Sequence, residues 1–151
     1  MKIIVDADAC PHIVKETLYR AAKRLQVPLW LVANQPLTIP RAPNIKFILV
    51  GSGFDVADNY IVENVEPGDL VISADIPLVA QVIEKEGFAL NPRGEFYTDE
   101  NVRQKLATRN LMHELRSIGR IMGGPPPPGQ KEQQAFANAL DRFLAKHIKK
   151  S

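Results

Sequence analysis

Residues 2–11 read Lys2-Ile3-Ile4-Val5-Asp6-Ala7-Asp8-Ala9-Cys10-Pro11. The consecutive β-branched residues at 3–5 predict a short, buried strand. Pro11 suits the first turn of a helix, and the spacing of the apolar residues after it extends that helix to about Leu25. Asp6 and Asp8 therefore stand where a buried strand gives way to a helix, and ligands of α/β sheets bind at that edge.

The same alternation of strand and helix continues along the chain. Strands are predicted at residues 28–32, 46–50, 70–73 and 88–90, and helices at residues 55–64 and 76–86. Each predicted strand is nearly all apolar, which is typical of parallel strands that are covered on both faces. We therefore expect a three-layer α/β/α domain with a mostly parallel sheet of about five strands.

The C-terminal part of the sequence predicts a helical extension. A helix is expected from Asp99 or Glu100 to residue 122, with Thr98 as its N-cap. The Gly/Pro-rich segment 123–129 ends that helix and predicts a stiff linker between a domain at 1–122 and a last helix within 130–151. Apolar residues on one face of this last helix indicate that it docks on the core or on a second subunit, which leaves a homo-oligomer possible.

Composition limits the class of protein. Of the 151 residues, 45% are hydrophobic and 24% are charged, and the net charge of +2 alone does not indicate a nucleic-acid binder. The single cysteine, Cys10, cannot form an internal disulfide and suits a reducing compartment. The apolar run before Asp6 is too short for a signal peptide, and no stretch approaches the roughly 20 apolar residues that cross a bilayer. We therefore expect a cytoplasmic protein without a membrane segment.

Four acidic motifs follow predicted strands or open predicted helices, at residues 5–8, 55–58, 73–75 and 98–100. In a parallel sheet the strand ends share one edge, so these carboxylates can converge although they are far apart in sequence. Converging carboxylates repel each other unless a proton or a hard cation such as Mg2+ or Mn2+ lies between them. The pattern favours divalent-metal chemistry, which in proteins is most often directed at phosphate esters.

Helix capping is the alternative for several of these acids. Asp8, Asp55 and Asp75 each stand near a predicted helix start, where a carboxylate accepts from free amides. Asp99 and Glu100 fit a first helical turn on dipole grounds alone. Capping explains one of the pair Asp6 and Asp8 but not both, and it favours Asp58, one turn inside its helix, over Asp55 as a ligand. Strand alternation further predicts that Asp6 and Asp8 project to the same side.

Cationic and hydroxyl groups could bind a polyanionic substrate. Ser73 could donate to a phosphate, and Arg93, in the loop Asn91-Pro92-Arg93-Gly94, suits bidentate phosphate recognition. Basic residues gather late in the chain, and Arg109 and Arg116 lie on a predicted helix with few acids. A cationic surface beside an acidic edge is how a nuclease holds its substrate, although a solvated helix surface gives the same pattern.

Several motifs in order give the chain a close resemblance to the YaiI/YqxD family of small bacterial proteins, whose activity is unassigned. They are Val-Asp-Ala-Asp-Ala-Cys-Pro (5–11), Asp-Val-Ala-Asp (55–58), Gly-Asp-Leu-Val-Ile-Ser-Ala-Asp-Ile-Pro-Leu (68–78), Asn-Pro-Arg-Gly (91–94) and Gly-Gly-Pro (123–125). The family in turn resembles the PIN-domain nucleases, which bind Mg2+ or Mn2+ through three or four acids on a parallel sheet.

The PIN resemblance implies a role for individual residues. Asp6 matches the first acid of those enzymes, and Ser73 with Asp75 matches their Ser/Thr-x-Asp motif. Asp58 would supply the mid-chain acid, and the fourth would be Asp8 or Asp99. The doubled Asp-x-Asp motif at residues 6–8 departs from the usual PIN pattern.

Three functional hypotheses follow. The first is a metal-dependent phosphodiesterase acting on RNA or another nucleic acid, with Asp6, Asp58 and Asp75 as catalytic residues and as metal ligands with Asp8. The second is a non-catalytic nucleic-acid-binding or regulatory module. The third is a phosphatase of the haloacid-dehalogenase type, in which the Asp-x-Asp motif supplies the nucleophile and the acid/base.

Overall fold

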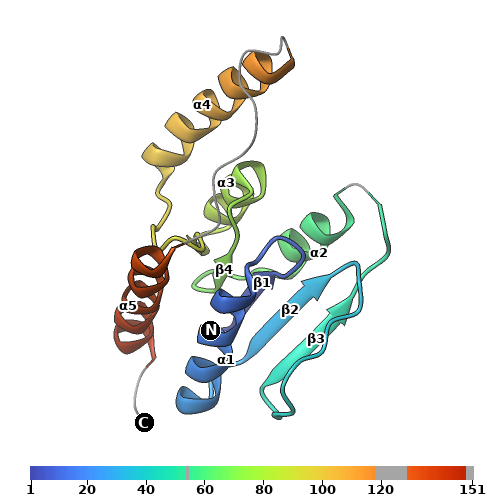
Figure 1. Cartoon of the computed structure of the whole chain (residues 1–151), viewed down its shortest axis with the longest axis vertical. Helices are drawn as coiled ribbons and strands as arrows, with labels where there is room; N and C mark the ends of the chain where they lie inside the picture. Colours follow the sequence, from blue (N-terminus) through green and yellow to red (C-terminus); the bar gives the residue numbers. More distant parts are fainter. Residues whose placement is uncertain (54, 118–128, 149–151) are drawn as a thin grey trace.

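A computed structural model describes residues 1–53, 55–117 and 129–148, with the backbone alone for residues 109–117. Five strands and three helices occupy residues 3–90, with a loop rather than a helix between the second and third strands, and two longer helices follow (Figure 1). The elements are β1 (Ile3–Asp6), α1 (His12–Leu25), β2 (Leu29–Ala33), β3 (Ile45–Leu49), α2 (Val56–Asn64), β4 (Leu70–Ile72), α3 (Ile76–Glu84), β5 (Phe88–Leu90), α4 (Asp99–Ser117) and α5 (Gln130–His147).

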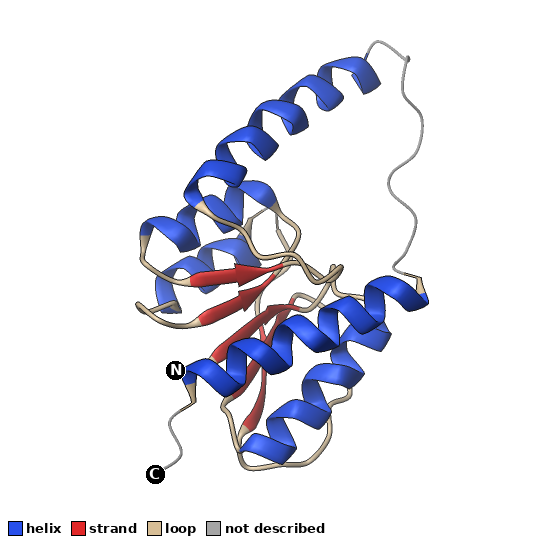
Figure 2. Ribbon diagram, turned by 90° about the vertical axis from the view of Figure 1, so that its left-hand side faces the viewer, coloured by secondary structure: helices blue, strands red, loops and turns tan. Residues whose placement is uncertain are grey.

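The sheet is entirely parallel, with strand order β3-β2-β1-β4-β5. Helices cover both of its faces: α1 and α5 lie on one side, and α2 and α3 lie on the other (Figure 2). The chain reverses its winding direction at β1, because β2 and β4 lie on opposite sides of this strand. The structure confirms the predicted three-layer α/β/α class and places the topological switch point, where such sheets bind ligands, at the end of β1.

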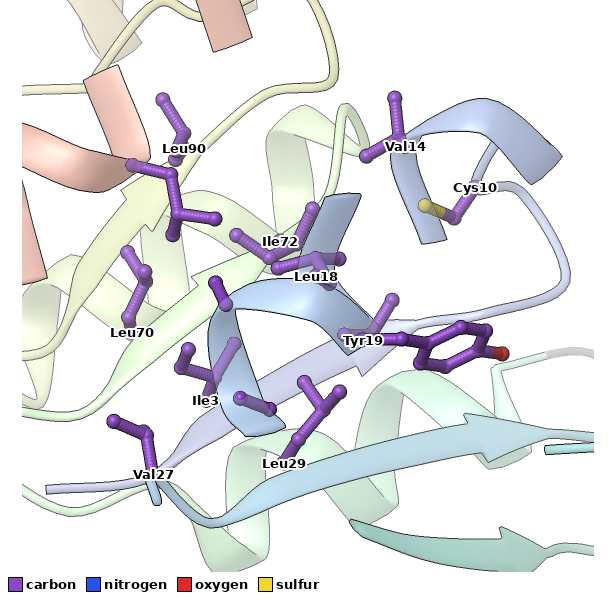
Figure 3. Close-up of a cluster of buried hydrophobic side chains, with 14 of the residues drawn as sticks. Ile3, Cys10, Val14, Leu18, Tyr19, Val27, Leu29, Leu70, Ile72 and Leu90 are labelled. Atoms are coloured by element: carbon purple, nitrogen blue, oxygen red, sulfur yellow. The ribbon is translucent and has the colours of Figure 1, made fainter. Parts of the chain in front are cut away.

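Strand alternation divides the core between the two faces of the sheet. In β1, Ile3 and Val5 pack toward α1 and α5, whereas Ile4 packs toward α2 and α3. Figure 3 shows the first of these clusters, in which Leu18 of α1 lies over Ile3 and its neighbours on β2 and β4. All three of these β1 side chains have no exposed surface. A strand buried on both faces must be apolar throughout, which accounts for the continuous hydrophobic run at 3–5.

The predicted element boundaries agree with the structure to within two residues, apart from the end of α4. The largest difference is at the end of α3, at Glu84 rather than residue 86, and others, such as the start of β3 at Ile45 rather than residue 46, are of one residue. The predicted end of the α4 helix at residue 122 and most of the predicted linker at 123–129 lie outside the described residues. No helix in the described part of the chain is long and apolar enough to cross a membrane.

The apolar face of α5 completes the core on the α1 side of the sheet. Phe136, Leu140 and Leu144 are at most 1% exposed and belong to the same cluster as Ile3. At the surface, Arg24 of α1 donates to Asp141 of α5 over 2.9 Å. The sequence predicted that the last helix docks on the core or on a second subunit. In the structure this helix, α5, packs on the core of its own chain.

Gly94 allows α5 to approach the turn after β5. Its φ of +92° lies in the left-handed region, and a Cβ at this position would lie 2.6 Å from the carbonyl carbon of Ala135. Only glycine satisfies both the backbone conformation and the close approach.

We predict that Gly94→Ala lowers the free energy of unfolding by about 2 kcal/mol or more, because the added methyl strains the backbone and displaces α5. Urea denaturation followed by circular dichroism measures the change. Gly51→Ala is the matched control, since no atom lies within 4 Å of a Cβ at Gly51. Equal stability of the two variants would contradict the close packing of α5 on this turn.

Candidate functional site

The alternation of β1 and β4 brings Asp6 and Ser73 to the same face of the sheet. Val5 pairs with Ile72, so the next residue of each chain segment, Asp6 and Ser73, lie side by side. Two positions earlier on each strand, Ile4 and Val71 pack toward α2 and α3, so Asp6 and Ser73 lie on that face. Both are buried, at 8% and 3% exposed. The Ser73 hydroxyl donates to Asp6 Oδ2 over 3.1 Å. A buried carboxylate is thereby held at the end of the central strand.

Ser73 also connects Asp6 to Asp75. The backbone N–H of Asp75 donates to the Ser73 hydroxyl oxygen over 3.0 Å. Asp75 is the N-cap of α3, and its Oδ1 accepts from the backbone N–H of Leu78 over 3.3 Å. The predicted capping role of Asp75 is thus present, and it fixes the carboxylate beside Asp6 rather than removing it from the site.

Asp58 of α2 forms a side-chain hydrogen bond with Asp75. Burial is the main reason that the pKa of Asp58 rises from 3.8 to about 7, and the negative charges of Asp75 and Asp6 raise it further. The hydrogen bond acts in the same direction, so protonated Asp58 is the donor and Asp75 the acceptor. A proton on Asp58 is thereby stabilised next to Asp75, and we call these two carboxyl groups the acid pair.

The pKa of Asp6 is also raised. The main cause of this rise is burial, and the hydrogen bond from Ser73 acts in the opposite direction. The negative charges of Asp75 and Asp8 raise the pKa further. We refer to Asp6, Asp58, Ser73 and Asp75 together as the acidic site. The structure thus brings together the three acids that sequence predicted as catalytic.

The donor chemistry of the acidic site fits a hard divalent cation, because its oxygens are anionic and their repulsion raises two pKa values. In the described part of the chain, however, no three His, Cys, Asp or Glu side chains are placed to hold a metal ion together. The described arrangement is the hydrogen-bonded pair Asp58 and Asp75, with Asp6 nearby. To hold a cation, these carboxylates would have to turn toward one point.

Asp8 lies at the margin of this site. Its Oδ2 accepts from the backbone N–H of Asn34, after β2, over 2.8 Å, and its side chain borders a small hollow that includes Lys15. Asp6 bonds to Ser73, after β4, and Asp8 bonds to the backbone of Asn34, after β2, so their hydrogen-bond partners follow different neighbours of β1. The chain turns directly after Asp6, so regular strand alternation does not extend to Asp8.

The remaining acidic candidates have local environments of their own. Asp55 is at the N-cap position of α2 with a φ of +65°, but its side chain makes no capping hydrogen bond. At the start of α4, Thr98 accepts from the N–H of Asn101, and Asn101 accepts in return from the N–H of Thr98. Thr98 is therefore the N-cap that sequence predicted.

Arg93 is tied to α5. Its Nη1 lies 3.5 Å from Glu132 Oε1, and its backbone N–H donates to Asn91 Oδ1 over 2.8 Å. Asn91 is buried and also accepts from the N–H of Glu95. The Asn-Pro-Arg-Gly segment thus forms the turn on which α5 docks, an arrangement that its Asn, Pro and Gly residues suit.

A groove next to the acidic site lies between the start of α3, the segment 95–97 and the first turns of α4. It has a volume of about 550 Å³, and its lining includes Ile76, Tyr97, Asn101, Gln104 and Lys105. Ile76 directly follows Asp75 in the chain, and the Lys105 ammonium lies 5.9 Å from the centre of the Tyr97 ring. We call this hollow the α3–α4 groove.

The predicted substrate-binding residues Arg109 and Arg116 fall in the later turns of α4, and their side chains lie outside the described residues. In Figure 1, α4 extends beyond α3 and away from the sheet. The helical backbone therefore continues from the α3–α4 groove toward the positions of these two arginines.

Cys10 does not have the environment of a nucleophile. Burial raises the pKa of its thiol to about 12, so the thiol stays protonated at neutral pH.

Comparison with known proteins gives a consistent family. The model described as "Uncharacterized BCR, YaiI/YqxD family" matches residues 4–146. A UPF0178 protein of Hahella chejuensis is 58% identical over 149 residues, covering 99% of each chain. A UPF0178 protein of Shewanella sp. (strain ANA-3) is 60% identical and covers 96% of this chain and 97% of its own. No solved structure gives a significant match.

The raised pKa of Asp58 makes the stability depend on pH. The pKa of Asp58 is about 7 in the folded protein and has its ordinary value of 3.8 in the unfolded chain, so the unfolded chain releases this proton at lower pH. The stability contribution is complete below the unfolded value and is lost as the pH rises toward about 7. We predict that Asp58→Asn is more stable than wild type near pH 8 by about 1 kcal/mol, a figure reduced for solvent screening of a partly exposed group.

Urea denaturation near pH 4 and near pH 8 measures this difference, which should almost vanish at the lower pH. Glu63→Gln is the control, because Glu63 is an exposed carboxylate on the same helix and is not among the charges that raise the pKa of Asp58. A wild-type stability that rises across this range, with no gain in Asp58→Asn at the higher pH, would contradict the repulsion among these acids.

Proposed function

The chain belongs to the YaiI/YqxD family, and we propose that this member is a divalent-metal-dependent phosphodiesterase that acts on RNA. The observation that supports the proposal is the acid pair Asp58–Asp75 beside buried Asp6, at the switch point of a parallel sheet. The negative charges of Asp75 and Asp6 help to raise the pKa of Asp58, and those of Asp75 and Asp8 help to raise that of Asp6, so the convergence of these carboxylates is unfavourable. A site that binds a cation gives a reason for keeping them together.

Asp6, Asp58 and Asp75 would hold Mg2+ or Mn2+, with Asp8 near enough to influence the charge of Asp6. When bound, such an ion supplies an activated water and neutralises charge on the phosphate. Release of the proton shared by Asp58 and Asp75 would free both carboxylates for this role. Ion binding and loss of that proton are therefore expected to be linked.

Ser73 would act as a positioning residue. Its hydroxyl donates to one acid and accepts from the backbone of another, so it fixes Asp6 relative to Asp75. This connection supports the resemblance of Ser73-Ala74-Asp75 to the Ser/Thr-x-Asp motif of PIN-domain nucleases. A direct contact of Ser73 with substrate is not needed for this role.

The α3–α4 groove is the proposed path of the substrate from the acidic site. Asn101, Gln104 and Thr108 offer neutral hydrogen-bonding groups along it, whereas Lys105 offers a positive charge and Glu95 a negative one. Single-stranded nucleic acid is held by cationic grooves that follow its backbone. Arg109 and Arg116 come next on the same helix and would extend the contact.

We predict that the purified protein cleaves single-stranded RNA only with Mg2+ or Mn2+, and that Asp6→Asn, Asp58→Asn and Asp75→Asn each slow cleavage about 100-fold or more. Asp141→Asn, which changes an exposed carboxylate on α5, should cleave at the wild-type rate. Initial rates on a fluorescently labelled RNA measure the effect. A thermal shift on adding Mn2+ to wild type but not to Asp58→Asn would report ion binding separately from activity.

Cleavage that persists in all three variants, or that needs no divalent ion, would overturn the proposal. RNA binding without hydrolysis that survives Asp6→Asn and Asp75→Asn in a chelator would instead identify a non-catalytic binding module. Hydrolysis of a phosphate monoester in the absence of RNA cleavage would favour the phosphatase hypothesis.

A further inference from the structure

A second groove lies at the β5 edge of the sheet, where β5 and the segment 94–98 meet the later turns of α5. Its volume is about 480 Å³. We call it the aromatic groove, and its main lining residues are Phe88, Phe96, Arg142, Phe143, Lys146 and His147. The sequence gave no indication of this groove, because its two halves are about 50 residues apart.

The rings of this groove form a connected stack. His147 lies 4.1 Å from Phe143 in a stacked geometry, as residues four apart on a helix can. The centre of the Phe88 ring lies 5.1 Å from that of Phe143 and 4.9 Å from that of His147, yet Phe88 remains 38% exposed. A large, exposed aromatic ring that is held in place by other rings is a ready platform for a flat ligand.

The charges around the rings favour an anion. Arg142 and Lys146 are exposed and lie on the same face of α5 as Phe143 and His147. None of the described residues that line the groove is acidic. Asp141, the neighbouring acid on α5, is paired with Arg24 of α1. A ligand with a planar ring and a negative group therefore matches the chemistry of the groove.

The aromatic groove adjoins the path from the acidic site. Tyr97 lines both the α3–α4 groove and the aromatic groove. Its backbone N–H donates to Ala89 of β5 over 3.0 Å, which holds this boundary against the sheet. One extended ligand could therefore contact Lys105 on one side of Tyr97 and Phe88 on the other.

We propose that the aromatic groove binds single-stranded RNA, with a base stacked on Phe88 and its phosphates beside Arg142 and Lys146. The choice of RNA rests on the proposed function. The groove itself is independent of the acidic site, because none of its described lining residues belongs to that site. Stacking on an aromatic ring suits any base, so the groove would hold the strand without reading its sequence.

Fluorescence anisotropy with a labelled oligoadenylate of about eight nucleotides tests the proposal in a chelator, where no metal-dependent cleavage occurs. Phe88→Leu, which keeps apolar bulk but removes the ring, should raise the Kd about fivefold or more, whereas Phe88→Tyr should bind as wild type does. Lys146→Gln should weaken binding and reduce its salt dependence. Lys131→Gln, an exposed lysine in the first turn of the same helix, is the charge control.

Equal affinity of Phe88→Leu and Phe88→Tyr, with both variants folded as judged by circular dichroism, would overturn the proposal. So would an abasic oligomer that binds as tightly as oligoadenylate, or AMP that binds as tightly as the strand. If binding fails while metal-dependent cleavage is present, only the groove assignment is lost. If cleavage fails while Phe88-dependent binding is present, the groove stands without the proposed activity.

Discussion

Burial of β1 on both faces is the constraint on which the rest of the structure depends. The strand lies between β2 and β4, and helices cover it from both sides, so Ile3, Ile4 and Val5 have no exposed surface. Asp6 comes next on the same path and is still 8% exposed. A carboxylate at that depth needs a partner, and the Ser73 hydroxyl at the end of the neighbouring strand is that partner. The acidic site therefore follows from where the central strand stops.

The acids of this site oppose the stability of the fold. Desolvation and mutual repulsion raise the pKa of Asp6 and bring that of Asp58 to about 7, so each added negative charge makes the folded state less favourable. By contrast, the buried Asp69 at the other end of β4 forms an ion pair with Lys2 and accepts hydrogen bonds from the backbone N–H groups of Lys2 and Glu66. Asp69 thus has a cation and two N–H donors, whereas Asp6 has the Ser73 hydroxyl and the nearby negative charges of Asp75 and Asp8. That contrast is typical of functional rather than structural carboxylates.

Local sequence patterns predicted the elements because each strand and helix carries its own periodicity. They also predicted Asp6, Asp58 and Asp75, since strand ends of a parallel sheet share one edge. They failed where a side chain depends on a distant turn: Asp8 bonds to the backbone of Asn34, and the position of that backbone cannot be read from residues near Asp8. The ion pair of Arg93 with Glu132 depends in the same way on where α5 docks.

Helix α5 has two roles that place different demands on one sequence. Phe136, Leu140 and Leu144 close the core beside α1, and Phe143 with His147 continues that face outward to the aromatic groove. The helix can take both roles because Gly94 lets its first turns approach the sheet edge closely. Gly94 itself lines the aromatic groove, beside Phe88. The close approach at Gly94 and the ring contact of Phe88 with Phe143 therefore both place α5 against this edge of the sheet.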